Sequence, residues 1–183
     1  LLVTHVGMAT TPTLYRNPGY KYDEFEYLGL INEVPMVVVA KPQMAANTWA
    51  ELNTWIGQNK GKVNLANAGL GSASHLCGLM LQNALKTEMT TVPYKGTAQS
   101  ISDLATGQVH MLFDSIPTGM PHVASGRLRA LAVTSEQRTK LSPDLPTIAE
   151  SGLPGYSSVT WFGVYGPAGM KPELVAKVNA AFN

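Results

Sequence analysis

The chain has 183 residues, of which 45% are hydrophobic and 14% are charged. This composition predicts a packed core and excludes a disordered chain. The net charge is +1 without any run of lysine or arginine, which argues against nucleic acid and anionic membranes as partners. The sequence shows no transmembrane-length apolar run and no signal peptide. The single cysteine, Cys77, excludes an internal disulfide and fits a buried, inert position in a helix.

The first elements in chain order are predicted from an apolar run and a helix cap. Residues 34–40 follow a turn-like Asn32-Glu33 pair and are typical of a buried strand. Thr48 and Glu51 have the spacing of a capping box, which predicts a helix that ends at Gly61.

Strand and helix patterns then alternate from residue 62 to residue 134. The strands are expected over 62–66, 89–94, 109–113 and 128–134, and the helices over 76–84, 97–106 and 118–125. This alternation predicts parallel βα units, in which ligands sit beyond the carboxyl ends of the strands.

The last part of the chain begins with a loop-rich segment. Residues 135–158 are rich in proline and glycine, and Thr147 is placed to cap one short helix among them. A strand is expected over 159–165, and Pro172 suits the first turn of a final helix.

The most informative stretch is residues 64–76, where a strand enters a glycine-rich turn that opens a helix lined with hydroxyl groups. A similar loop follows at 92–97. Helix starts carry unpaired N–H groups and the positive end of the helix dipole, so two of them predict an anion trap and a small carboxylate as ligand. A tight turn with an ordinary cap by Ser72 or Ser74 explains the first loop equally well.

Two other interpretations of this stretch find little support. The dinucleotide fingerprint requires Gly or Ala where Ser74 stands, and no P-loop ending is present. An α/β hydrolase or transferase that uses Ser74, His75 and Asp114 is the alternative function. However, Gly-x-Ser-x-Gly is absent, and adjacent helical residues point about 100° apart.

Several candidate side chains have both a binding and a structural interpretation. His75 fits a first-turn donor to a ligand or a half-buried structural histidine. Lys95 supplies charge to an anion or lies on the surface, and Tyr94 stacks on a ligand or covers the sheet edge. Asp114 accepts from a ligand or a bridging water, or caps the next helix.

Six stretches together resemble one known family, and they cover nearly the whole chain in the family's order. They are residues 67–76, 92–96, 107–114, 126–134, 145–155 and 161–163. The family is that of the substrate-binding proteins of tripartite tricarboxylate transporters, the Bug-type receptors. The resemblance implies a periplasmic, monomeric receptor that performs no catalysis, uses no cofactor or metal, and delivers a small carboxylate to a membrane permease.

The resemblance also implies the fold and the site. The fold is α/β and periplasmic-binding-protein-like, with two lobes, linker strands near 37–40 and 128–134, and the ligand in an interlobe cleft. Lobe one is expected to hold 1–40 and 128–183, and lobe two 41–127. The implied ligand contacts are Thr4, Ser72, Ala73, Ser74, His75, Tyr94, Lys95, Gly96, Thr97 and Asp114.

This chain departs from the family pattern at both ends. Family members have an upstream glycine-rich loop that grips one carboxylate, and they continue past the equivalent of Asn183. The sequence opens on Leu1-Leu2-Val3 as if inside a strand. We therefore expect a chain that is truncated at both ends and an incomplete lobe one.

Overall fold

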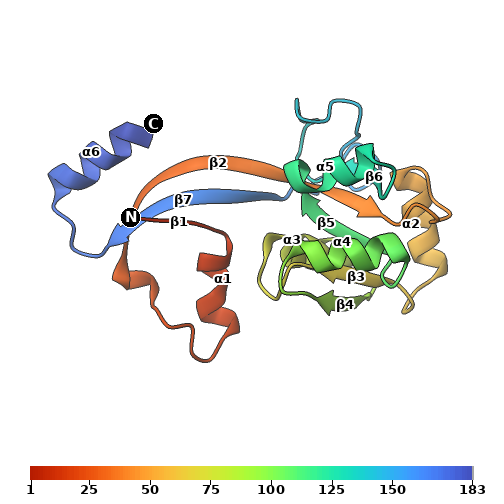
Figure 1. The fold of residues 1–183 in the computed structure, drawn as a ribbon, viewed down its shortest axis with the longest axis horizontal. Helices are drawn as coiled ribbons and strands as arrows, with labels where there is room; N and C mark the ends of the chain where they lie inside the picture. The colour runs from red at the N-terminus through yellow and green to blue at the C-terminus, as the bar shows by residue number, and fades with distance from the viewer. Residues whose placement is uncertain (183) are drawn as a thin grey trace. The chain divides into compact units, whose positions relative to one another are not determined.

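The computed structural model describes residues 1–182, which fold as two compact units. Unit 1 contains residues 1–34 and those from 160 onward, and unit 2 contains Pro35–Val159. The chain passes between the units inside β2 (Phe25–Ala40) and at the start of β7 (Val159–Pro167) (Figure 1).

Unit 1 is built on an antiparallel strand pair. β1 (Leu2–His5) pairs with β7, with Thr4 opposite Gly163. The remaining elements of unit 1 are α1 (Gly7–Leu14), η1 (Tyr22–Glu24), the first part of β2 and α6 (Pro172–Phe182). A hydrogen bond of 2.7 Å from Asn179 Nδ2 to the carbonyl oxygen of Leu28 holds α6 to β2.

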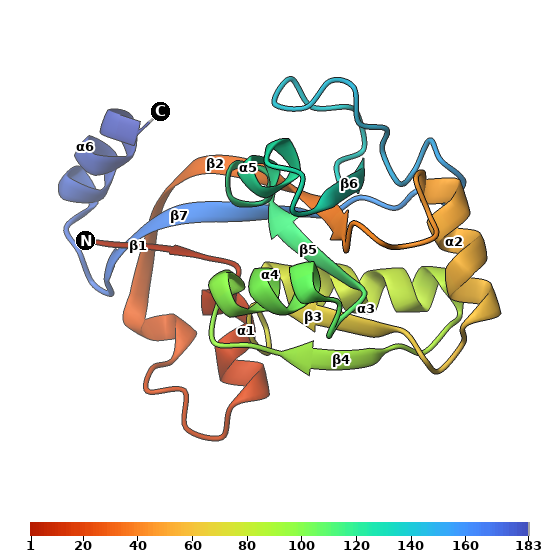
Figure 2. The ribbon, with the colours of Figure 1, turned by 45° about the vertical axis from the view of Figure 1, so that its right-hand side comes forward.

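The sheet of unit 2 contains three parallel neighbours. β3 (Asn64–Asn67) lies between β4 (Thr90–Pro93) and β5 (Met111–Ser115), and all three run in the same direction. The second part of β2 pairs antiparallel with β5 and also with β6 (Arg129–Val133). Figure 2 shows the arrows of β3 and β4 pointing the same way.

Helices cover both faces of this sheet. On one face, α2 (Trp49–Gln58) and α3 (Ala73–Leu85) pack on a core that includes Trp49, Leu81 and Phe113. The other face is covered by α4 (Thr97–Thr106) and α5 (Ile116–Ala124) over a second core, which includes Leu104 and Leu112. Each large apolar side chain that is fully buried contributes about 1.5–3 kcal/mol to the stability of the folded state. The two cores hold the helices, and hence their first turns, in fixed positions.

Several predicted elements are confirmed at nearly the expected bounds. Thr48 caps α2, because its Oγ1 accepts from the amide of Glu51 at 3.2 Å. α3 follows Ser72, and the final helix begins at Pro172. The α/β fold class is confirmed as well.

Other predictions were wrong in detail. The pair Asn32-Glu33 is not a turn but lies within β2, whose exposed central part tolerates polar residues. The short helix at Thr147 is a turn instead, in which Thr147 Oγ1 accepts from the amide of Glu150. The cap of α4 is Gly96 rather than Thr97, and α5 begins at Ile116 rather than Thr118.

The compact units divide the chain at different positions from the expected lobes. The chain changes unit after Val34 and after Val159, whereas we expected linker strands near 37–40 and 128–134. β6 lies wholly within unit 2. The assignment of 41–127 to lobe two, and of 1–40 and 128–183 to lobe one, stays a prediction about the lobes of the whole receptor.

Candidate functional site

Three helices of unit 2 begin at one edge of its sheet. α3 follows β3, α4 follows β4 and α5 follows β5, and these three strands are parallel neighbours. Because their carboxyl ends meet at the same edge, the three helix N-termini do so too (Figure 2). The sequence predicted an anion trap from the first two of these starts, and the observed convergence places donors and positive dipole ends together.

The start of α3 is fixed by hydrogen bonds within its own loop. Ser72 is the N-cap, and its Oγ accepts from the amide of His75 at 3.2 Å and donates to the carbonyl of Gly69 at 2.7 Å. Ser74 is buried, and its Oγ accepts from the amide of Ala68 at 2.9 Å. Both hydroxyls shape the loop, so the anion-binding groups that α3 offers at this edge are first-turn N–H groups such as that of Ala73.

His75 is oriented by the same loop. Its Nδ1 accepts from the amide of Gly71 at 3.1 Å, so the neutral ring carries its proton on Nε2. Burial lowers the pKa of His75, which favours this neutral form. His75 therefore presents a neutral Nε2–H donor in the first turn of α3.

The start of α4 has no side-chain cap. Gly96 occupies the N-cap position at φ 117°, a conformation that glycine adopts readily, and Thr97 is the first helical residue. Lys95 is exposed beside it. The first amides of α4 thus remain available to an external acceptor, next to a lysine charge.

Tyr94 is engaged with the outer side of α4. Its hydroxyl donates to Asp103 Oδ2 at 2.9 Å, while Gln99 Nε2 donates to Asp103 Oδ1 at 2.8 Å. Burial and the neighbouring carboxylate raise the pKa of Tyr94. Tyr94 is therefore a residue that holds the loop before α4 in place.

Asp114 lies near the end of β5 and is 2% exposed. Its Oδ1 accepts from the amide of Ser115 at 2.9 Å, and its Oδ2 is buried with no hydrogen-bond partner in the described part of the chain. Burial raises its pKa to about 6. The N-cap of α5 is Ser115, so the alternative prediction that Asp114 caps this helix is wrong.

Thr4 belongs to the other compact unit. It lies on β1, half-buried, opposite Gly163 of β7. The other nine predicted contacts all lie in unit 2, so Thr4 stays a contact predicted from the resemblance.

The proposed nucleophile and its base do not pair. Ser74 Oγ and His75 Nδ1 are each bonded to a backbone amide of the 68–71 loop, and Asp114 Oδ1 is bonded to the amide of Ser115. A serine nucleophile needs its hydroxyl on the base, at about 3 Å. Within residues 1–182, no group of three His, Cys, Asp or Glu side chains is placed to hold a metal ion.

Asn67 is a further buried residue at this edge, and it is not among the contacts predicted from the sequence. It is 1% exposed at the end of β3, and its Oδ1 accepts from the amide of Gly69 at 2.9 Å. Its Nδ2 is buried without a partner among the residues that the structure describes. The available signal was an asparagine between a buried strand and a glycine turn, where Asn side chains bond to the backbone two residues on.

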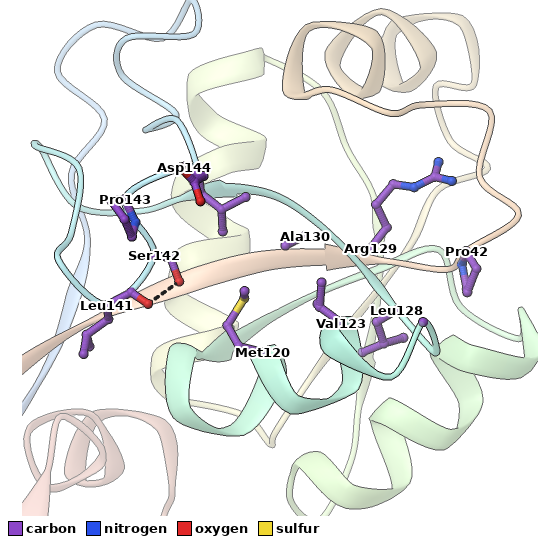
Figure 3. A pocket seen from close by; sticks show the side chains of 12 residues that line it. Pro42, Met120, Val123, Leu128, Arg129, Ala130, Leu141, Ser142, Pro143 and Asp144 are labelled. Atoms are coloured by element: carbon purple, nitrogen blue, oxygen red, sulfur yellow. Dashed lines mark hydrogen bonds between the residues drawn. The ribbon is translucent and has the colours of Figure 1, made fainter.

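A separate pocket of about 570 Å³ lies elsewhere in unit 2 (Figure 3). α5, β6 and the segment 141–145 surround it, and Met120, Val123 and Leu128 line it. The guanidinium of Arg129 is turned toward the loop before α2, where Nη1 donates to the carbonyls of Met44 and Ala46. None of the predicted ligand contacts lines this pocket, so it is distinct from the sheet edge.

Comparison with solved structures defines the class of protein. The chain is similar to the periplasmic binding protein BugD, at 42% identity and a TM-score of 0.86, over 99% of this chain and 61% of that one. It is 34% identical to Rpa4515 of R. palustris with adipate (TM-score 0.89; 98% and 61% covered). It is 32% identical to MatC of Rhodopseudomonas palustris with bound malate (TM-score 0.84; 98% and 62%). The fold is thus that of a periplasmic binding protein.

The chain belongs to the tripartite tricarboxylate transporter family receptors. The sequence model of this family matches residues 1–183. A curated relative, a UPF0065 protein of Agrobacterium vitis, is 35% identical over 99% of this chain and 53% of its own length. The chain spans about half the length of the curated relatives it matches. No helix within residues 1–182 is long and apolar enough to cross a membrane.

Proposed function

We propose that this protein captures a small carboxylate at the edge where α3, α4 and α5 begin. The observation that carries this proposal is the convergence of three helix N-termini at the carboxyl ends of β3, β4 and β5. Adipate and malate in two similar solved structures support a dicarboxylate as the ligand class.

The free energies expected of these contacts are compatible with reversible binding. A hydrogen bond to a charged group contributes about 1.5–3 kcal/mol, and a helix terminus adds about 0.3–1 kcal/mol. A few such contacts, less the losses of translational and side-chain freedom, give roughly −8 kcal/mol, which corresponds to about micromolar affinity. A receptor that must release its cargo requires no more.

The predicted contacts of unit 2 have distinct proposed roles. The amides of Ala73 and Ser74 bind the anion behind the Ser72 cap, and His75 Nε2–H donates without adding charge. The remaining contacts come from the second and third loops. The Gly96-Thr97 start of α4 offers uncapped amides, Lys95 supplies charge, Tyr94 fixes the loop, and Asp114 accepts from a ligand donor or a bridging water. Thr4 completes the proposed set.

The wider role follows from family membership. We propose that the receptor works in the periplasm as a monomer and delivers its carboxylate to the membrane permease of a tripartite tricarboxylate transporter. Its task is capture and release, with no chemistry on the ligand.

Thermal unfolding with a ligand panel tests the proposal. The panel contains mono-, di- and tricarboxylates, among them malate and adipate, and 1,6-hexanediol serves as a control that matches adipate in length without its charges. A ligand at 100 times its Kd adds about 2.7 kcal/mol to the stability of the folded state. We expect at least one carboxylate to raise Tm and to be recovered unchanged. The proposal is wrong if no carboxylate raises Tm or if the ligand is converted.

A further inference from the structure

Two buried polar atoms at the sheet edge of unit 2 lack a hydrogen-bond partner among residues 1–182, and they have opposite chemistry. Asn67 Nδ2 is a donor and Asp114 Oδ2 is an acceptor. They cannot satisfy each other because they lie on opposite faces. Asn67 shares the α2 and α3 face with Leu65, and Asp114 shares the α4 and α5 face with Leu112.

The orientation of the Asn67 amide is set by its other atom. Its Oδ1 accepts from the amide of Gly69, so the NH₂ group is the part without a partner. The backbone carbonyl of Asn67 accepts from the amide of Tyr94 at 3.0 Å, which leaves little freedom for this residue to turn. The side chain is therefore tied through Oδ1 to the loop that opens α3, and Nδ2 is the atom left to bond elsewhere.

A buried donor without an acceptor is unfavourable, and a state that provides the acceptor is stabilised relative to it. The groups that surround the start of α3 are themselves mostly donors, among them the first-turn amides and His75 Nε2–H. An oxygen acceptor with negative charge suits this arrangement best, because several donors share it.

We propose that Asn67 is a ligand-binding residue whose Nδ2 donates to a carboxylate oxygen of the bound solute. This inference rests on the proposed function, and it adds a neutral donor behind the start of α3. Gly69 and Gly71 have positive φ values, so the turn that carries the chain from Asn67 to α3 uses conformations that glycine adopts readily. The structure thus assigns Asn67 a binding role that the sequence alone did not indicate.

The variant Asn67→Asp tests this role. An aspartate keeps an oxygen that accepts from Gly69, but it has no donor in place of Nδ2 and adds a negative charge. The matched control is Asn83→Asp, which adds the same charge at an exposed position on α3. By calorimetry with malate and with adipate, we expect at least a tenfold loss of affinity for Asn67→Asp and less than a twofold change for Asn83→Asp.

A measurement on the unmodified full chain covers the case in which Asn67→Asp fails to fold. The side-chain ¹⁵NH₂ resonances of Asn67 are followed by NMR during titration with malate and adipate. We expect both protons to shift and to exchange more slowly with solvent at saturation. Unchanged resonances at saturating ligand overturn the inference.

The outcomes separate the inference from the proposed function. If a carboxylate binds the unmodified protein and Asn67→Asp binds it equally well, the inference is wrong and the receptor proposal stands. If no carboxylate binds the unmodified protein, the proposed function fails and the inference fails with it.

Discussion

The amide of Tyr94 donates a 3.0 Å hydrogen bond to the carbonyl oxygen of Asn67. This bond joins the carboxyl end of β4 to that of β3, immediately before the loops that open α4 and α3. A Cβ atom added at Gly69 would approach the carbonyl oxygen of Tyr94 to 3.3 Å, so the two loops are also closely packed. The two helix starts therefore form one connected surface.

Gly69→Ala tests this close packing. Gly69 has φ 123°, where an alanine is strained, and its Cβ would press on Tyr94. We expect a loss of roughly 2 kcal/mol or more in the free energy of unfolding, measured with urea.

The control for that variant is Gly61→Ala, at φ 74° with open space around its Cβ. It carries the backbone strain without the close contact, so it is expected to lose only about 1 kcal/mol. Equal losses of unfolding free energy in the two variants would show that the close packing of the two loops contributes nothing to stability.

Ser72→Ala removes the cap of α3. The hydroxyl makes two hydrogen bonds in the loop, and loss of an N-cap destabilises a protein by typically about 1 kcal/mol. Carboxylate affinity is expected to fall as well, because the first-turn amides become less ordered. Ser102→Ala, at an exposed position on α4, serves as the comparison in urea unfolding. A matching effect of the two variants would contradict the cap assignment.

The ring of His75 is expected to be neutral with its proton on Nε2 at pH 7. Burial lowers its pKa, and Nδ1 accepts from Gly71. Imidazole ¹⁵N chemical shifts report both properties in one pH titration. A ring protonated on Nδ1, or a pKa above the ordinary value of about 6.5, would contradict this description.

Asp114→Asn is expected to stabilise the protein at neutral pH. Because burial raises the folded-state pKa to about 6 from 3.8, the native state retains a proton that the unfolded state has lost between about pH 4 and pH 6. The contribution of Asp114 to stability therefore falls as pH rises through that window, by up to about 3 kcal/mol.

The measurement for Asp114→Asn is urea unfolding of both proteins from pH 4 to pH 8. The asparagine has no charge to bury, so its advantage over the native protein is expected to grow up to about pH 6.5 and then to stay constant. A difference that does not vary with pH would refute the buried, unpaired carboxylate.

Local signals in the sequence predicted much of unit 2. The capping hydrogen bonds of Thr48 and Ser72 each join residues only three positions apart, so the starts of α2 and α3 were predictable. The alternation of strands and helices predicted parallel βα units, and with them the shared edge. The length of β2 was not predictable, because Asn32 and Glu33 lie on an exposed part of the strand where local propensity has little influence.

The roles of individual site residues depended on contacts that sequence patterns do not encode. The stacking and sheet-edge interpretations of Tyr94 stay predictions, but neither included the hydrogen bond from its hydroxyl to Asp103 on the next helix. Asn67 and Asp114 both stand at strand ends, but only burial across the sheet reveals that each has an unsatisfied atom. Such burial is set by tertiary packing.

The most direct test of the account is a ¹⁵N–¹H NMR titration of the chain with malate and adipate, followed at the backbone amides of the three helix starts. We predict that the amides of Ala73 and Ser74, of Thr97 and Ala98, and of Ile116 shift together and give one common Kd. Shifts confined to a single helix start, or no shifts at saturating concentrations of either acid, would contradict the claim that the three starts bind one carboxylate.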